Sequence, residues 1–92
     1  MDLRLTVNRE GGSTVVHVDG RLAVRGVDDL ERAVTDATGT VILDLTNLLS
    51  ADDAGVAALR LLRQRGVQLK GASPYVMLLL RAGQSRGARD ER

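Results

Sequence analysis

Residues 40–62 read TVILDLTNLLSADDAGVAALRLL, and this stretch decides the fold. Its first part, from Thr40 to Leu45, is a nearly continuous apolar run rich in β-branched residues, which is typical of a strand buried on both faces. Residues 46–51 are expected to form a loop, and a helix is expected from about Asp52 to Arg65. The apolar stripe of this helix consists of Val56, Leu59 and Leu62. A buried strand that leads into an amphipathic helix predicts an α/β architecture.

The segment before this stretch predicts a β-hairpin and a first helix. Apolar and polar residues alternate over residues 3–8 and, after a Gly11-Gly12 turn signal, alternate again over residues 14–19. A helix is expected to open at Asp28 and Asp29, because carboxylates in a first turn suit the positive end of the helix dipole.

The segment after it predicts a short strand over residues 67–70 and a third helix. Ser73 is the expected N-cap of that helix, Pro74 its first residue, and residues 75–82 are strongly apolar. The predicted order is therefore β-β-α-β-α-β-α. This order predicts an α/β fold with a mixed four-stranded sheet and about three helices mainly on one side.

Composition bounds the domain count and excludes several classes of protein. The 92 residues suffice for one small domain, expected over residues 1–82, and the polar segment 83–92 is expected to be a disordered tail. A net charge of +1 and a single aromatic residue argue against a nucleic-acid binder. There is no cysteine, only one histidine, no apolar run long enough for a bilayer and no secretory signal pattern. Neither metal nor membrane insertion is predicted, and the expected compartment is the cytoplasm.

Catalytic and cofactor motifs are absent from the sequence. No phosphate-binding glycine loop and no nucleophile elbow occur, so no catalytic, cofactor-binding or metal-binding residue is predicted. His17 lies in a predicted strand without an accompanying nucleophile and is expected at the surface or rim of the sheet. Asp44 ends the buried strand, where α/β folds often place ligands, but a carboxylate satisfied by loop amides is the preferred interpretation.

The same central stretch resembles the STAS family, the sulfate transporter and anti-sigma factor antagonist domains. In that family a strand ending in Asp-Leu is followed by a loop, then by Asp-Ser-Ser-Gly or Asp-Ser-Ala-Gly, and then by a Leu-rich helix. Asp44-Leu45 and the segment from Asp52 to Gly55 occupy the corresponding positions. The resemblance covers residues 14–82. It is also carried by Val16, Val18, Gly20 and Leu22, and by Gly66, Val67, Leu69, Gly71, Ser73, Pro74, Val76, Leu79 and Leu80.

The resemblance implies a non-enzymatic regulatory module that binds a protein partner. In regulatory members the hydroxyl residue directly before the motif glycine is phosphorylated by a partner kinase that is also an anti-sigma factor. Here that position is Ala54, so no phosphorylation site is carried over. The partner-binding segment implied by the resemblance consists of Ser50, Asp52, Asp53, Ala54 and Gly55.

The residues of this segment also have a purely structural interpretation. Ser50 and Asp53 have the spacing of a capping box, and Asp52 is a second candidate cap. Two acids at a helix start are each stabilised by the dipole by about 0.3–1 kcal/mol. Gly55 inside a helix costs about 1 kcal/mol relative to alanine, which indicates close backbone packing on the sheet or on a partner.

Two partner classes remain open at this point. The first is an anti-sigma factor of the kinase type, which the protein would occupy so that the sigma factor is released. The second is the ATPase of a phospholipid-transporting ABC complex, on which small cytoplasmic STAS subunits dock. The sequence also leaves room for an exposed sheet edge or apolar helix face that a partner or a second copy of the chain would cover.

Overall fold

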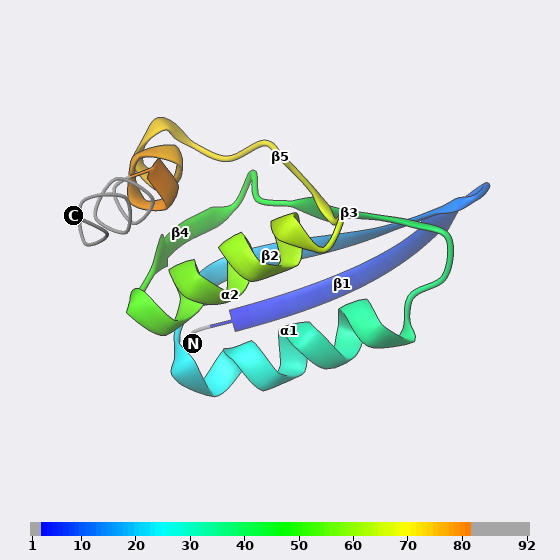
Figure 1. Cartoon of the computed structure of the whole chain (residues 1–92), viewed down its shortest axis with the longest axis horizontal. Coiled ribbons are helices and arrows are strands. Elements are labelled where there is room, and N and C mark those ends of the chain that lie inside the picture. Colours follow the sequence, from blue (N-terminus) through cyan, green and yellow to red (C-terminus); the bar gives the residue numbers. More distant parts are fainter. Residues whose placement is uncertain (1–2, 82–92) are drawn as a thin grey trace.

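The computed structural model describes residues 3–81 of the chain. The elements run in the order β1 (Leu3–Glu10), β2 (Ser13–Leu22), α1 (Val24–Asp36), β3 (Thr40–Asp44), β4 (Leu48–Ala51), α2 (Asp53–Gln64) and β5 (Gln68–Lys70). A further helix covers residues 74–81 (Figure 1). The tail predicted at residues 83–92 lies outside the described residues.

The strands form one mixed sheet that is four strand positions wide. Its order is β1-β2-β3-β5, with β1 antiparallel to β2 and the other neighbours parallel. Strand β4 also pairs with β2 in parallel. It pairs with the last residues of β2, Gly20 to Leu22, whereas β3 pairs with the first residues of β2, Ser13 to His17. Strands β3 and β4 therefore follow one another in the same position beside β2. The predicted mixed α/β fold is confirmed.

Strand β4 corrects the expectation of a loop over residues 46–51. Gly20 of β2 pairs with Leu48 and Arg21 pairs with Ser50, so the ladder skips Leu49. This two-against-one pairing is a β-bulge, and a bulge re-aims the extra residue. The sequence pattern hid the strand because a bulge breaks the alternation of apolar and polar residues.

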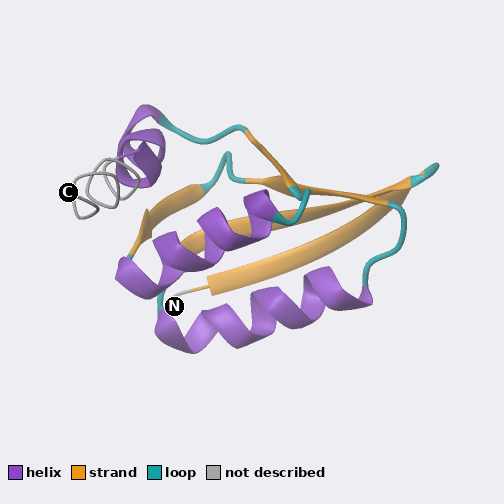
Figure 2. Cartoon of the chain, in the orientation of Figure 1, coloured by secondary structure: helices purple, strands orange, loops and turns teal. Residues whose placement is uncertain are grey.

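One face of the sheet carries the main core. Cross-strand register places Leu5 beside Val18 and Val16 beside Leu43, all on the same face. Helices α1 and α2 lie against that face (Figure 2). The fully buried core side chains are mostly leucines and valines: Val16, Val18, Leu22, Leu30, Leu43, Leu45, Leu59, Leu62 and Val76. Because the one aromatic residue of the chain, Tyr75, is exposed, branched aliphatic side chains fill the space between helices and sheet.

Helix α1 starts earlier than the sequence pattern predicted. It begins at Val24 rather than at Asp28, so Gly26 lies in its first turn. A Cβ atom at Gly26 would collide with the side chain of Leu3 in β1. The glycine therefore allows the first turn of α1 to approach the sheet closely, which the residue's low helix propensity does not reveal.

The start of the last helix agrees with its prediction. The hydroxyl of Ser73 accepts a hydrogen bond from the backbone N–H of Val76 at 3.2 Å, as an N-cap does, and Pro74 follows at the first helical position. Val76 and Leu80 point into the core and anchor this helix.

Candidate protein-binding site at the start of helix α2

Asp52 caps α2 and reaches α1 as well. Its Oδ1 atom accepts a hydrogen bond from the backbone N–H of Gly55 at 2.8 Å, which satisfies one of the unpaired donors of the first turn. Its Oδ2 atom accepts one from the backbone N–H of Val24, the first residue of α1, at 3.2 Å. The residue before α1, Ala23, provides no side-chain cap. One carboxylate therefore serves the N-termini of both helices.

The backbone of Asp52 fixes the same corner to the sheet. Its N–H donates to the carbonyl of Leu22, the last residue of β2, at 3.0 Å, and its carbonyl accepts from the N–H of Val56 at 2.8 Å. The predicted capping box of Ser50 and Asp53 is wrong, because Ser50 lies in β4 opposite Arg21 and the cap is Asp52. The chain is thus held rigidly where it leaves the sheet and enters α2.

Gly55 is buried against the end of β2. A Cβ atom there would collide with the carbonyl oxygen of Leu22 and lie 3.0 Å from its Cγ atom. Of the two alternatives for close packing, the structure supports contact with the sheet. Gly55 therefore acts on any binding surface by setting the position of α2 and not by contacting a partner.

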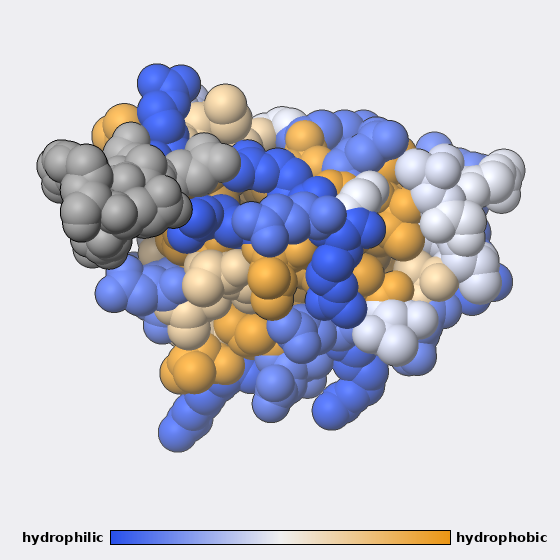
Figure 3. Space-filling model, in the orientation of Figure 1, coloured by the Kyte–Doolittle hydropathy of each residue, from blue (hydrophilic) through white to orange (hydrophobic). Residues whose placement is uncertain are grey.

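The outward side of α2 is weakly polar for its first two turns. Asp53 and Ala57 are exposed, Ala54 is half-buried, and Leu61 further along is 50% exposed. Ala54 is thus less accessible than expected for an open helix start. Apolar atoms follow the visible face of α2, bordered by hydrophilic side chains (Figure 3).

Leu49 is a candidate site residue that the sequence analysis missed. It is the bulged residue of β4, three positions before the cap Asp52, and its side chain is 69% exposed. The consecutive leucines at 48 and 49 carried a usable signal. Neighbouring residues of a strand point to opposite faces, so only one of the two could enter the core. Leu48 is buried at 2% exposure and Leu49 points outward.

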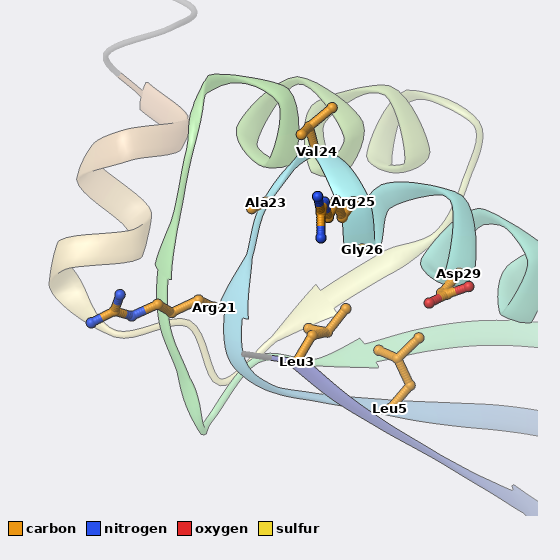
Figure 4. Close-up of a pocket in the computed structure, with 8 residues that line it drawn as sticks. All are labelled: Leu3, Leu5, Arg21, Ala23, Val24, Arg25, Gly26 and Asp29. Atoms are coloured by element: carbon orange, nitrogen blue, oxygen red, sulfur yellow. The ribbon is translucent and has the colours of Figure 1, made fainter. Parts of the chain in front are cut away.

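The helix over residues 74–81 adds further exposed apolar side chains. It lies beside β4 in two different views (Figures 1 and 4). Tyr75, Met77 and Leu78 are exposed by 54%, 49% and 61%. The apolar run that starts at Tyr75 therefore does not face the sheet with all of its side chains.

A shallow pocket of about 730 Å³ opens near the first turn of α1 (Figure 4). Leu3, Leu5 and Val24 supply apolar lining, and Arg25 and Asp29 supply charges of opposite sign. The side chain of Arg21, which also lines the pocket, extends away from the other lining residues. The lining thus lacks the concentrated charge of an ion-binding pocket.

His17 and Asp44 form a polar pair on the other face of the sheet. His17 Nδ1 lies 3.3 Å from Asp44 Oδ2, and the two residues are direct neighbours in the β2–β3 ladder. Asp44 Oδ1 accepts hydrogen bonds from the hydroxyl of Thr46 at 2.6 Å and from its backbone N–H at 3.0 Å. These bonds, together with the charges of His17 and Lys70, lower the pKa of Asp44 below its usual value. The carboxylate is satisfied by the loop, as the structural interpretation of Asp44 predicted.

The described part of the chain offers neither a metal cluster nor a membrane-spanning helix. Within residues 3–81, no three His, Cys, Asp or Glu side chains gather as a metal site. No helix in that range is long and apolar enough to cross a membrane.

Comparison with known proteins finds similar solved structures. No protein-family model matches the chain, and no curated protein matches it. The crystal structure of Mglu is similar with a TM-score of 0.60 and 29% identity over 75% of this chain. The chain spans only 19% of the length of Mglu.

Two anti-sigma factor antagonists are similar over most of their length. The STAS domain of the antagonist from Rhodobacter sphaeroides gives a TM-score of 0.54 and 24% identity, covering 78% of this chain and 90% of that one. SpoIIAA in its unphosphorylated form gives a TM-score of 0.66 and 16% identity, covering 88% and 81%. At these identities the likeness establishes the architecture, and the chain has the STAS fold.

Proposed function

We propose that the protein is a non-enzymatic regulatory module that binds an anti-sigma factor of the kinase type through the start of α2. By occupying this partner it releases a sigma factor, in the setting of bacterial transcription in the cytoplasm. The fold shared with anti-sigma factor antagonists supports the class of function. The observation that carries the proposal is the exposed Leu49 immediately ahead of a rigidly capped α2.

The proposed surface has the physical properties of a binding site. Exposed apolar side chains on neighbouring elements commonly mark protein interaction surfaces. Here Leu49 precedes α2, and Ala57 and Leu61 lie on the outward side of the helix. The Asp52 carboxylate accepts a hydrogen bond from the first turn of each helix, and these bonds order the segment before any partner arrives. A surface that is already ordered loses less conformational entropy on binding, which favours affinity.

The proposed module lacks a phosphorylation switch. A switch of this kind adds about −1.5 to −2 charge at a position that must pack against a partner. The methyl group of Ala54 cannot accept a phosphate. Asp53, one residue earlier, carries a single negative charge, which is smaller than that of a phosphoserine. We therefore expect one permanent binding state, with Asp53 weakening association without preventing it.

A pull-down from the native host with three baits tests the proposal. The baits are the wild-type chain, Ala54→Arg, and the control Gln68→Arg, whose exposed side chain lies on β5, a strand that pairs with β3 and not with β4. Ala54→Arg adds bulk and positive charge at a helix N-terminus, so we expect this variant not to dock. The proposal predicts that the wild type and Gln68→Arg capture a kinase-type anti-sigma factor and that Ala54→Arg does not. Capture of an ABC-transporter ATPase by the wild type and Gln68→Arg, but not by Ala54→Arg, would favour the second partner class. Equal capture of a partner by all three baits would contradict the placement of the binding site at the start of α2.

A further inference from the structure

Strand β1 leaves an open hydrogen-bonding edge. It is the terminal strand of the sheet and pairs only with β2 among the described residues. It is eight residues long, and every residue from Thr6 to Glu10 is exposed. An exposed edge strand presents unpaired N–H and C=O groups to any chain that can align with it.

The register of the hairpin determines which residues of β1 offer these groups. Gly11 and Gly12 form a two-residue turn with Gly11 at a φ of +60°, which fits a type II′ turn, and the closing pair is Glu10 with Ser13. Pairs that exchange both hydrogen bonds alternate with pairs that exchange none. Counting back from the closing pair, the even-numbered residues bond to β2. The outward groups therefore belong to Leu3, Leu5, Val7 and Arg9.

The charges on β1 select one self-pairing register. An antiparallel copy of β1 must place odd residues opposite odd residues to use their outward groups. If Val7 lies opposite Val7 of the second copy, Arg4 lies opposite Glu10 and Glu10 opposite Arg4. Shifting the centre to Thr6 would place Arg4 opposite Asn8 and lose both ion pairs. Charged residues on an edge strand usually discourage pairing, but here their signs match in this register.

We propose that two copies of this chain pair through β1 in antiparallel orientation about a two-fold axis centred on Val7. The interface is isologous, so each contact occurs twice. Val7, which is 49% exposed in the single chain, meets its counterpart at the centre. The stem of Arg9 lies opposite Leu5, where its methylene groups cover an apolar side chain. The two sheets become one continuous sheet.

Charge-reversal variants of the full chain test this register in sedimentation and light-scattering measurements over a series of protein concentrations. The wild type is expected to approach twice its mass of 9.9 kDa as concentration rises. Arg4→Glu and Glu10→Arg should each weaken association about tenfold, because like charges then face each other twice. The double variant Arg4→Glu/Glu10→Arg should restore the wild-type behaviour.

A second variant and hydrogen exchange keep the test independent of folding defects. Val7→Pro removes an outward N–H while leaving the bonds to β2, and proline is tolerated on the outer edge of a sheet. It should remain monomeric with an unchanged circular dichroism spectrum. The amides of Leu5, Val7 and Arg9 should become protected in the wild type as concentration rises. A wild type that stays monomeric would overturn the proposal, as would a dimer that both single charge reversals leave intact.

Discussion

Asp52 and Val24 are 28 positions apart in the chain, yet Asp52 Oδ2 accepts a hydrogen bond from the backbone N–H of Val24 at 3.2 Å. The other carboxylate oxygen caps α2 through Gly55 at 2.8 Å. One side chain thus holds two helix starts beside the end of β2. These hydrogen bonds, with the two made by the backbone of Asp52, explain how this segment keeps a fixed shape on the surface.

Replacing Asp52 with alanine should destabilise the fold more than one ordinary cap would suggest. Loss of a helix N-cap costs about 1 kcal/mol, and here a second helix start loses its partner too, so we expect about 1–2 kcal/mol. Urea unfolding measures the difference. Asp53→Ala is the matched control, since Asp53 lies in the first turn of α2 but is not its cap, and it should cost only the dipole stabilisation of about 0.3–1 kcal/mol. Equal losses in both variants would contradict the bridging role.

Gly55→Ala should also destabilise the protein, because the new methyl group has no room beside the Leu22 carbonyl. Overpacking of this kind costs about 1–3 kcal/mol. Gly12→Ala is the control, since a Cβ atom at Gly12 would meet nothing within 4 Å. Thermal unfolding of the two variants gives the comparison. A Gly55→Ala protein as stable as Gly12→Ala would show that α2 moves away from β2 without loss.

Stability should fall in acid through Asp44. The Thr46 hydroxyl and N–H, aided by the charges of His17 and Lys70, lower the pKa of the folded carboxyl below its ordinary value of 3.8. A lowered folded pKa stabilises the protein above the unfolded pKa, and this stabilisation is lost as the pH falls through the folded pKa. Thr46→Val removes the largest of these contributions and should flatten the decline in unfolding free energy between about pH 5 and pH 2. Chemical denaturation across that range measures it, and identical profiles for variant and wild type would refute the assignment.

The wild-type protein should gain no phosphate from its partner kinase. Besides the missing hydroxyl at Ala54, Thr46 donates its hydroxyl to Asp44 and Ser50 is half-buried within β4. Incubation with partner and ATP, followed by intact-mass measurement, is the test. Ala54→Ser is the positive control and is expected to become a substrate. A stoichiometric mass gain in the wild type at Ser50 or Thr46, accompanied by altered affinity, would mean that the switch has moved to another residue.

The sequence predicted most of the fold because its periodic signals are local. The alternation in β1 and β2, the β-branched run of β3 and the stripe of α2 each lie within a dozen residues. The missed features depend on contacts between distant residues. Strand β4 exists because the end of β2 pairs with it, and α1 starts at Val24 because Asp52 and Leu3 meet its first turn.

The features of the candidate site likewise fall into those that local sequence predicts and those that depend on contacts between distant residues. The cap at Asp52 and the tight packing at Gly55 could be predicted from residue type and position. The second hydrogen bond of Asp52 could not, because it spans two helices. The consecutive leucines at 48 and 49 indicated that one of them is exposed, but which one depends on the register of β4 against β2. The pairing of His17 with Asp44 likewise required the parallel register of β2 and β3.

Calorimetric titration of the captured anti-sigma factor with the wild type, Ala54→Arg and Gln68→Arg tests the central claim most directly. Circular dichroism first establishes that all three chains are folded. The account predicts that the wild type and Gln68→Arg bind with equal affinity and that Ala54→Arg shows no measurable heat of binding. Binding of Ala54→Arg with the wild-type affinity would contradict the assignment of the partner surface to the start of α2.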